Sequence, residues 1–424
     1  MTEQNEIRFD SLDLPPELQA GIQAAGFEHC TPIQAATLPR ALAGRDVAGQ
    51  AQTGTGKTAA FLLATLNRLV TSEKQGDGKN PRAIMLAPTR ELAIQIFEDA
   101  KVLGSGTDFR FQVVFGGADY DKQRDKLEKG VDVLIGTPGR FIDYFKQGVF
   151  NLKQVEVVVL DEADRMFDLG FIKDIRYVLR RLPDADQRLN LLFSATLSQK
   201  VLELAYEHMN EPESVSIEPE KLTADLVTEA VYFPSNREKI PLLIGLLKGK
   251  DPTRTMVFVN TKREAEKLER FLPFNGIEAK AISGDVPQNK RMRMLKSFQA
   301  GELPVLICTD VASRGLHVPD VSHVFNYDLP TDCEDYVHRI GRTARAGATG
   351  DSISFACENF AMSLPDIEKY IGHSLPVQSI TDELIVRIKI PPKPEFKDRG
   401  GPRRGGGGNR GGGGNRGGGN SRRR

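Results

Sequence analysis

A glycine-rich stretch that ends in Lys57 and Thr58 carries the clearest chemistry in the sequence. AQTGTGKT spans residues 51–58 and precedes the apolar stretch AAFLLATLNRLV. In such a loop, backbone N–H groups and the N-terminus of the following helix face an anion. Lys57 is predicted to reach the β- and γ-phosphates of a nucleotide, and the Thr58 hydroxyl to join a Mg²⁺ shell. The predicted ATP-binding segment is Ala51, Gln52, Thr53, Gly54, Thr55, Gly56, Lys57 and Thr58. Ala51 departs from the general pattern, which has Gly there, and an accidental glycine-rich turn is the alternative.

Two adjacent carboxylates supply the other half of this chemistry. VEVVVLDEAD places Asp161 and Glu162 at the end of an apolar run. A phosphate-bound metal needs an acidic partner, so we expect Asp161 to hold Mg²⁺. Glu162 is then the candidate to orient and deprotonate the attacking water. Alone, these acids would rather begin a solvated helix, because Asp and Glu favour first turns. Beside a phosphate loop they predict nucleoside triphosphate hydrolysis.

Three arginines near the C-terminus complete the set of candidate catalytic residues. Arg339, Arg342 and Arg345 are spaced by three in HRIGRTARAG, and on a helix or tight turn such side chains point the same way. Guanidinium groups stabilise the transition-state charge of a γ-phosphate. A basic surface face is the usual explanation of such a triplet. The second half of the chain lacks a Gly-Lys-Thr loop, which favours arginines that act on a nucleotide held by the first half.

Short apolar runs must position these residues. They are RAIMLAPT (82–89), VDVLIGT (131–137), VEVVVLDEAD (155–164), LNLLFSAT (189–196), TMVFVNT (255–261) and PVLICTD (304–310). Such runs, alternating with helical patterns, predict an α/β protein with buried parallel strands. Ligands of these sheets bind beyond the carboxyl ends of the strands. The chemically interesting residues mostly follow the predicted strands directly.

The two halves of the chain are near-repeats of each other. Predicted strands end at Thr89 and Thr137 in the first half and at Thr261 and Thr309 in the second. The separation within each pair is the same, so both strands of the second half follow their counterparts at one common offset. Matched patterns at a common offset favour two tandem copies of one α/β domain with a cleft between them. The predicted domains are 1–218 and 219–390, joined around residues 215–228.

The last part of the chain, 391–424, has a different composition. Residues 399–424 contain 8 Arg, 13 Gly and no acidic residue, although the whole chain is balanced at 57 basic and 57 acidic groups. Without apolar side chains, and with many glycines to order, this tail is expected to be disordered. Interleaved Arg and Gly indicate a phosphate-contacting arm for single-stranded nucleic acid. A solubilising tail without a specific role is the alternative.

Several classes of protein are disfavoured by the sequence. MTEQNEIRFD lacks the features of a secretory signal, and no apolar run approaches the ~18 residues that span a membrane. The four cysteines, Cys30, Cys308, Cys333 and Cys357, are far apart, so no disulfide framework or local zinc site is expected. A reducing, cytoplasmic setting without membrane or disulfides is the expectation.

The chain resembles the DEAD-box RNA helicases of superfamily two over about residues 1–375. Asp161-Glu162-Ala163-Asp164 is the motif that names the family, and GFEHCTPIQ (26–34) resembles its adenine-reading motif. The resemblance implies two RecA-like domains, ATP and Mg²⁺ as cofactors, and RNA as the partner. It also implies that Gln34 contacts the adenine edge, that Phe9 packs on the base, and that Arg342 and Arg345 act as arginine fingers.

The resemblance assigns further residues to RNA and to coupling. The implied RNA-binding residues are Pro88, Thr89, Arg90, Gly117, Thr137, Pro138, Gly139, Arg140, Asn260, Thr261, Gln288, Arg291, Thr309, Arg314 and Gly315. The implied coupling residues are Ser194, Thr196, Asp310 and Arg339.

Within the family, DLGFIKDIR (168–176) and YIGHSLPV (370–377) resemble the bacterial RhlB type. This implies a role in RNA degradation, with ribonuclease E and other degradosome components as partners. His317 stands where many relatives have an Asp associated with ribose contact and domain coupling. The alternatives for His317 are a different hydrogen bond, weaker coupling in the isolated protein, or a surface histidine without a role.

The expected activity is RNA-stimulated ATP hydrolysis that unwinds short RNA duplexes locally. The same motifs would serve an ATP-gated RNA clamp with little unwinding, or a DNA helicase. An RNA chaperone that uses the fold only as scaffold is a third alternative, but it leaves Lys57, Asp161, Glu162 and the arginines without a role.

Overall fold

The computed structural model describes residues 7–51, 54–73, 77–217, 227–250, 254–283, 285–313, 321–343 and 349–392. By its internal contacts the chain divides into two units, Met1–Lys389 and Ile390–Arg424. The predicted tail lies outside the described residues from residue 393 onward. The first unit contains two separate parallel sheets, which are described in turn.

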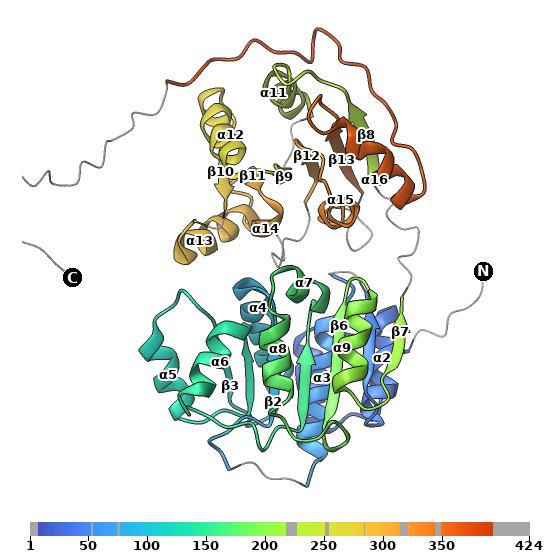
Figure 1. Ribbon diagram of the computed structural model, residues 1–424, viewed down its shortest axis with the longest axis vertical. Helices are drawn as coiled ribbons and strands as arrows, with labels where there is room; N and C mark the ends of the chain where they lie inside the picture. The colour runs from blue at the N-terminus through green and yellow to red at the C-terminus, as the bar shows by residue number, and fades with distance from the viewer. Residues whose placement is uncertain are drawn as a thin grey trace, which may run out of the picture. The chain divides into compact units, whose positions relative to one another are not determined.

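In the described chain, the first sheet has seven strands in the order β3-β4-β2-β5-β6-β1-β7, and all neighbours are parallel. Figure 1 labels β3, β2, β6 and β7 of this sheet. The strands are β1 (Val47–Gln50), β2 (Ala83–Leu86), β3 (Phe111–Val114), β4 (Val133–Gly136), β5 (Val157–Leu160), β6 (Leu189–Ser194) and β7 (Glu213–Ser216). The helices around it are α1 (Pro16–Ala24), α2 (Pro32–Leu42), α3 (Lys57–Thr71), α4 (Arg90–Leu103), α5 (Tyr120–Glu128), α6 (Pro138–Lys146), α7 (Ala163–Asp168), α8 (Ile172–Leu179) and α9 (Gln199–His208), with 3₁₀ turns at Phe9–Ser11 and Ala185–Gln187.

The second sheet has six strands within the described ranges, in the order β10-β11-β9-β12-β13-β8, again all parallel. The strands are β8 (Val227–Tyr232), β9 (Thr255–Phe258), β10 (Ala279–Ile282), β11 (Val305–Cys308), β12 (His323–Asn326) and β13 (Gly350–Phe355). Its helices are α11 (Lys239–Lys250), α12 (Lys262–Phe274), α13 (Gln288–Gln299), α14 (Asp310–Ser313), α15 (Cys333–Ile340) and α16 (Leu364–Ile371), with a 3₁₀ turn at Ala361–Ser363.

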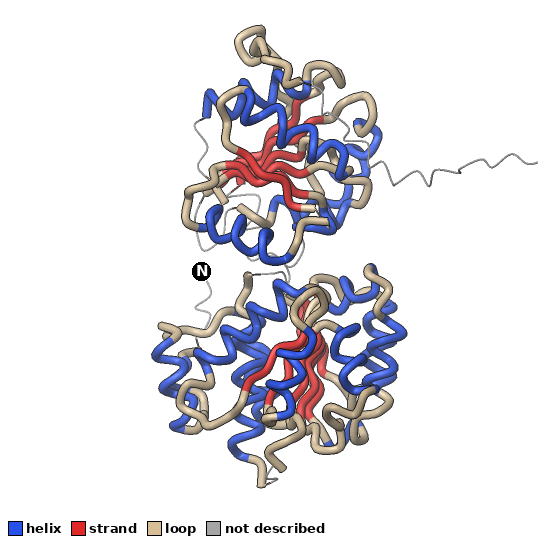
Figure 2. The backbone as a smooth tube through the Cα atoms, turned by 90° about the vertical axis from the view of Figure 1, so that its left-hand side faces the viewer, coloured by secondary structure: helices blue, strands red, loops and turns tan. Residues whose placement is uncertain are grey.

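Helices cover both faces of each sheet (Figure 2). In β6, Leu191 and Phe193 belong to the apolar cluster on one face, whereas Leu192 belongs to the cluster on the other. In β11, Ile307 and Leu306 are divided between two clusters in the same way. Successive strand residues point to opposite faces, so a strand covered on both sides must be apolar throughout. This confirms the predicted fold of two parallel sheets flanked by helices.

The internal repeat is visible in the strands themselves. β9 follows β2 in the chain at the same offset at which β11 follows β4. The orders of the two sheets also agree, so that β10, β11, β9, β12, β13 and β8 take the places of β3, β4, β2, β5, β6 and β1. The predicted boundary at 218/219 lies between β7 and β8, outside the described residues, and stays a prediction.

The strands are shorter than the apolar runs that predicted them. The run 155–164 yields only Val157–Leu160, because Asp161 ends the strand and Ala163 begins α7.

The chain beyond α16 stays in contact with the second sheet's helices as far as Lys389. The Lys389 N–H donates to Oδ1 of Asn275, which caps the C-terminus of α12, at 2.7 Å. None of the four cysteines, all of which are described, is paired. In the described chain, no helix has the length and apolar character needed to cross a membrane.

Candidate nucleotide and RNA sites

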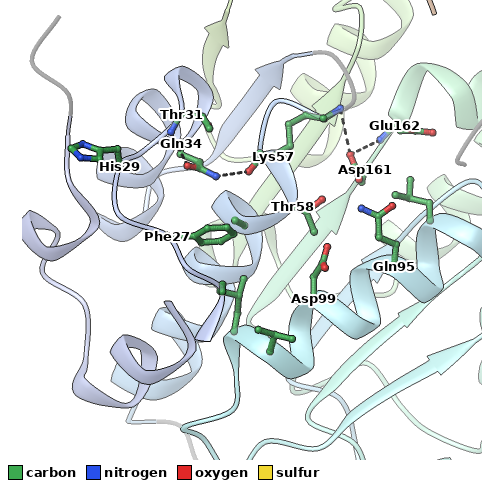
Figure 3. Close-up of a pocket in the computed structure, with 17 residues that line it drawn as sticks. Phe27, His29, Thr31, Gln34, Lys57, Thr58, Gln95, Asp99, Asp161 and Glu162 are labelled. Atoms are coloured by element: carbon green, nitrogen blue, oxygen red, sulfur yellow. Dashed lines mark hydrogen bonds and ion pairs between the residues drawn. The ribbon is translucent and has the colours of Figure 1, made fainter. Parts of the chain in front are cut away.

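A cavity of about 450 Å³ lies at the carboxyl ends of the first sheet's strands (Figure 3). Its lining includes Gln34, Lys57, Thr58, Asp161 and Glu162. These residues come from α2, from the start of α3 and from the segment after β5. A parallel sheet brings such positions together at one edge. Residues predicted from separate motifs therefore share one cavity.

The phosphate loop leads directly into α3, which begins at Lys57. Gly54 has a φ of 90° and Gly56 a φ of 94°, values in the left-handed region that glycine adopts without strain. A Cβ on Gly56 would also lie 2.5 Å from Gln34 Nε2. Position 56 therefore requires glycine, because the backbone is left-handed there and because a Cβ would collide with the Gln34 side chain. Ala51 is buried, and its N–H donates to the Ser194 carbonyl at 3.0 Å; Gln52 and Thr53 lie outside the described residues.

Gln34 joins the start of α2 to the phosphate loop. Its Oε1 accepts from the Thr31 N–H at 2.8 Å, and its Nε2 donates to the Gly56 carbonyl at 3.0 Å. Thr31 precedes α2, and Gln34 lies in the first turn of that helix. The side-chain amide is therefore oriented by contacts on both of its ends.

The aromatic wall of the cavity differs from the one that the sequence suggested. Phe9 is only 2% exposed and does not line the cavity, whereas Phe27 does. The two rings stack with centroids 5.6 Å apart. Phe9 therefore lies in the apolar core behind Phe27, and Phe27 is the ring available to a base. Phe27 stands inside the adenine-reading motif, which was the signal for it.

Lys57 and Asp161 form a buried ion pair, with Nζ and Oδ1 3.9 Å apart. Both side chains are less than a tenth exposed. Burial raises the pKa of Asp161 to about 6, although the charge of Lys57 opposes this rise. A lysine ammonium and an aspartate carboxylate thus lie side by side in a buried part of the cavity wall.

Glu162 is held in a strained conformation. Its φ of 53° and ψ of 54° are left-handed, and it precedes the first residue of α7. Such strain in a non-glycine residue persists only where the surroundings enforce it, and it is enriched at functional sites. The Glu162 N–H donates to Asp161 Oδ1 at 2.9 Å, so the Asp161 carboxylate is held against the backbone of Glu162.

The end of β6 contacts the same acidic segment. Ser194 Oγ accepts from the Asp164 N–H at 3.1 Å, and the Thr196 N–H donates to Asp164 Oδ2 at 3.3 Å. The predicted coupling residues Ser194 and Thr196 are thus bonded to the last residue of the DEAD tetrapeptide. A movement of α7 would therefore change the hydrogen bonds of both Ser194 and Thr196.

The predicted RNA residues of the first domain gather at one end of β2, β3 and β4. Thr89 accepts from the Leu92 N–H at 3.3 Å and caps α4, while Thr137 precedes Pro138, the first residue of α6. A Cβ on Gly117, whose φ is 78°, would lie 2.3 Å from Arg90 NH1. Motifs that are distant in sequence are therefore adjacent here. Helix N-termini beside an arginine suit phosphate groups. Of the other residues predicted to bind RNA in this domain, Pro88 is buried, and Gly139 and Arg140 lie in the first turn of α6.

The second domain repeats part of this arrangement. Thr261 accepts from the Glu264 N–H at 3.2 Å and caps α12, as Thr89 caps α4. Thr309 precedes α14, and the Arg291 guanidinium donates to the Ala312 carbonyl. Gln288 begins α13, but its side chain lies outside what the structure describes, as do Arg314, Gly315 and His317.

Arg339 is the centre of a buried polar network. It is 1% exposed, and its guanidinium donates to both carboxylate oxygens of Asp310, at 2.6 and 2.7 Å. It also donates to Asn260 Oδ1 at 2.8 Å and to the Asp328 carbonyl at 2.6 Å. Asp310 and Arg339 were predicted as coupling residues, and Asn260 as an RNA ligand. The structure brings these three together.

Arg342 follows α15 and is 5% exposed. Burial lowers its pKa from the ordinary value. Arg345 lies outside the described residues, so its predicted role stays a prediction.

Further cavity residues were not anticipated from the sequence, among them the polar residues Gln95 and Asp99. Gln95 and Asp99 reach the cavity from α4 (Figure 3). Burial raises the pKa of Asp99. The face that a helix turns to a cavity depends on its packing, and no motif marked these two positions.

The sequence matches known families over most of its length. Residues 31–204 match the DEAD/DEAH box helicase family, and residues 238–347 match the helicase conserved C-terminal domain. The chain belongs to the DEAD/DEAH box helicase family.

Relatives and solved structures agree with this family. The ATP-dependent RNA helicase RhlB of Xanthomonas axonopodis is 59% identical over 391 residues, which cover 92% of this chain and 68% of the relative. The RhlB of Shewanella frigidimarina is 56% identical, covering 91% of this chain and 89% of the relative. The structure of S. cerevisiae Dbp5 bound to RNA and ADP BeF3 has a TM-score of 0.76 and 34% identity, covering 87% of this chain and 95% of Dbp5. The predicted RhlB type of DEAD-box helicase is confirmed.

Proposed function

We propose that this DEAD-box protein is an ATP-dependent RNA helicase that binds ATP with Mg²⁺ in the cavity of its first domain and unwinds short RNA duplexes locally. The observation that carries the proposal is the convergence of Lys57, Asp161 and Glu162 on one cavity. An ammonium, a metal-binding carboxylate and a general base are the groups that triphosphate hydrolysis requires. Hydrolysis of ATP, and RNA as the partner, follow from the family.

The donors at the cavity fit a magnesium ion. Thr58 offers a hydroxyl and Asp161 a carboxylate, and both line the cavity next to Lys57. Mg²⁺ prefers such hard oxygen ligands, keeps several waters, and is bound through one or two protein groups together with substrate phosphates. The ion would supply charge neutralisation at the β- and γ-phosphates.

Glu162 is the proposed general base. Its strained backbone and the hydrogen bond from its N–H to Asp161 Oδ1 fix the backbone position from which its side chain extends. It would orient the attacking water and accept its proton, while Lys57 holds the phosphate that receives the water. Gln34 and Phe27 would hold the base at the other end of the cavity.

RNA is proposed to bind along the carboxyl ends of the strands in both domains. The candidate contacts are helix N-termini at Thr89 and Thr261 and the guanidinium of Arg90, which suit phosphate and sugar rather than base edges. Recognition should therefore be independent of sequence. If ATP and RNA each contact both domains, each favours the closed state and raises the affinity for the other.

Arg342 and Arg345 are proposed to complete the ATP site from the second domain. They would stabilise charge on the γ-phosphate only when the domains close. Closure would bend one RNA strand so that a duplex partner cannot follow. Hydrolysis would then reopen the domains and release the strand. This division of labour would make hydrolysis depend on RNA.

A role in RNA degradation is also proposed. The high identity to RhlB proteins supports it, and the partners would be ribonuclease E and other degradosome components in the cytoplasm. Capture of purified ribonuclease E by the full chain, with the RNA removed by nuclease, tests this part by itself.

The principal test is ATPase activity with and without single-stranded RNA, compared with single-stranded DNA. We expect strong stimulation by RNA, weak stimulation by DNA, and loss of both in Lys57→Ala. Repeated strand displacement from a short RNA duplex with ATP, against at most a single round with a non-hydrolysable analogue, separates a helicase from a clamp. Equal stimulation by DNA, or turnover that survives in Lys57→Ala, would contradict the proposal.

A further inference from the structure

The second domain contains a buried lysine–aspartate pair that the proposed function does not use. Lys239 is the first residue of α11, and its Nζ forms an ion pair with Asp328 Oδ1. Both side chains are only 5% exposed. The ammonium also lies 4.0 Å from the centroid of the Tyr327 ring. This ion pair is the Lys239–Asp328 pair below.

The Lys239–Asp328 pair occupies the place that Lys57 and Asp161 occupy in the first domain. Lys57 begins the helix after β1, and Lys239 begins the helix after β8. Asp161 directly follows β5, and Asp328 lies just beyond β12. β8 and β12 hold the positions of β1 and β5 in the repeated strand order. The second copy therefore keeps both charges without a Gly-Lys-Thr loop for phosphate.

In the second domain these charges satisfy each other and hold two functional side chains. Asp328 Oδ2 accepts from the Asn260 N–H at 2.9 Å. The Asp328 carbonyl accepts from Arg339 NH1 at 2.6 Å, and the next carbonyl, that of Leu329, accepts from Asn260 Nδ2 at 2.8 Å. One short segment after β12 thus orients a candidate RNA ligand and the arginine at the centre of the polar network.

We propose that Lys239 is a positioning residue for the RNA response of the second domain. By pairing with Asp328 it fixes the segment to which Asn260 and Arg339 are bonded. Lys239 thus orients Asn260 and Arg339 from the position at which the first domain has Lys57, the lysine proposed to bind phosphate. The inference rests on the proposed function, because Asn260 matters only if RNA binds there.

The physical basis is the cost of an unpaired buried charge. Removing Lys239 leaves the Asp328 carboxylate buried without its cation, so Asp328 must turn towards water or become protonated. Either change disturbs the acceptors of Asn260 and Arg339. The ATP cavity of the first domain contains neither Lys239 nor Asp328, so nucleotide binding without RNA should not respond.

The test uses the full chain with Lys239→Met, and Arg82→Met as the matched control. Arg82 and Glu156 form an ion pair that is similarly buried, with Nε and Oε1 2.7 Å apart, but they precede β2 and β5 at the opposite ends of the strands. Both variants should unfold at lower temperature. Only Lys239→Met should weaken the affinity for single-stranded RNA, by about tenfold or more, and lower RNA-stimulated turnover. The dissociation constant for ATP without RNA should stay within about twofold in both.

A second comparison separates positioning from stability. Adding Lys239→Met to Asn260→Ala should weaken RNA binding little further, because both changes act through the same contact. The double variant Lys239→Met/Asp328→Asn removes both charges and should recover the unfolding temperature without recovering RNA affinity. It also serves as the test if Lys239→Met does not fold.

The outcomes decide between the alternatives. Wild-type RNA affinity and turnover in folded Lys239→Met, or in the double variant, would overturn the inference and leave the pair a purely structural one. Fully additive effects of Lys239→Met and Asn260→Ala would overturn it as well. If the unmodified chain shows no RNA-stimulated ATPase activity, the proposed function itself has failed, and this result is distinct from a failure of Lys239→Met alone.

Discussion

Gln34 donates a hydrogen bond from Nε2 to the carbonyl oxygen of Gly56 at 3.0 Å. This contact joins the first turn of α2, whose Gln34 is expected to read adenine, to the loop that is expected to hold phosphate. Because Gly56 immediately precedes Lys57, the first residue of α3, the orientation of the amide and the start of the phosphate-binding helix depend on each other. Occupation of the base site should therefore influence the phosphate site.

Gln34→Glu should weaken ATP binding by more than the loss of one base contact. A carboxylate cannot donate to the Gly56 carbonyl, and it adds a negative charge to a cavity that must hold a triphosphate. A neutral hydrogen bond contributes about 0.5–1.5 kcal/mol, so its loss alone gives about a two- to tenfold effect, and repulsion adds to it. Calorimetric titration with ATP measures the change. Gln23→Glu, which makes the same change at an exposed position of α1, should leave the affinity as it is. Equal affinities in the two variants would show that the contact with Gly56 is dispensable.

Glu162→Gln should separate binding from hydrolysis. The amide keeps the size of the side chain but cannot accept a proton from water, so turnover should fall about 10²–10⁴-fold. Binding of ATP and RNA should persist, because Lys57 and Asp161 are unchanged. Single-turnover hydrolysis and RNA-binding titrations test this together. Glu98→Gln, on the exposed side of α4, provides the control. Turnover close to that of the unmodified protein would remove Glu162 as the base.

Arg342→Lys should lower turnover far more than nucleotide affinity. Lysine keeps the charge but lacks the planar fork that can contact two oxygens of a phosphate. If Arg342 acts only on the γ-phosphate in the transition state, the catalytic constant falls while the affinity for ATP stays almost the same. Steady-state kinetics at saturating RNA measure this split, with the exposed Arg237→Lys as control. The same result is expected for Arg345→Lys. An unchanged catalytic constant would leave Arg342 with a structural role in its own domain.

Much of the fold could be read from the sequence because two physical patterns are strong in it. Buried parallel strands must be apolar on both faces, and the run at 189–196 yields β6 at Leu189–Ser194. Duplication preserves spacing, so the offset between Thr89 and Thr261 recurs between β2 and β9. Both signals are local or periodic, and neither requires knowledge of packing.

The features that were missed all depend on tertiary packing. Phe9 and Phe27 are both aromatic residues near the adenine-reading motif, and only their stacking decides which ring faces the cavity. Asp99 reaches the cavity because of the face that α4 turns towards it. Lys239 and Asp328 are 89 residues apart, and no sequence pattern predicted that these two side chains pair. Contacts between distant segments are where sequence patterns carry the least information.

Removal of residues 399–424 should weaken RNA binding and flatten its dependence on salt. This segment carries 8 arginines and no acidic residue, and each phosphate contact to a single strand adds about 0.7 to the slope of log K against log salt. If all the arginines engage phosphate, the slope becomes shallower by at most about 5 to 6. RNA titrations between low and moderate salt measure it. A chain of full length with these arginines changed to glutamine controls for length and glycine content. ATP binding without RNA should not change, because the cavity lies entirely in the first domain. An unaltered slope would restrict the RNA contacts to the folded domains.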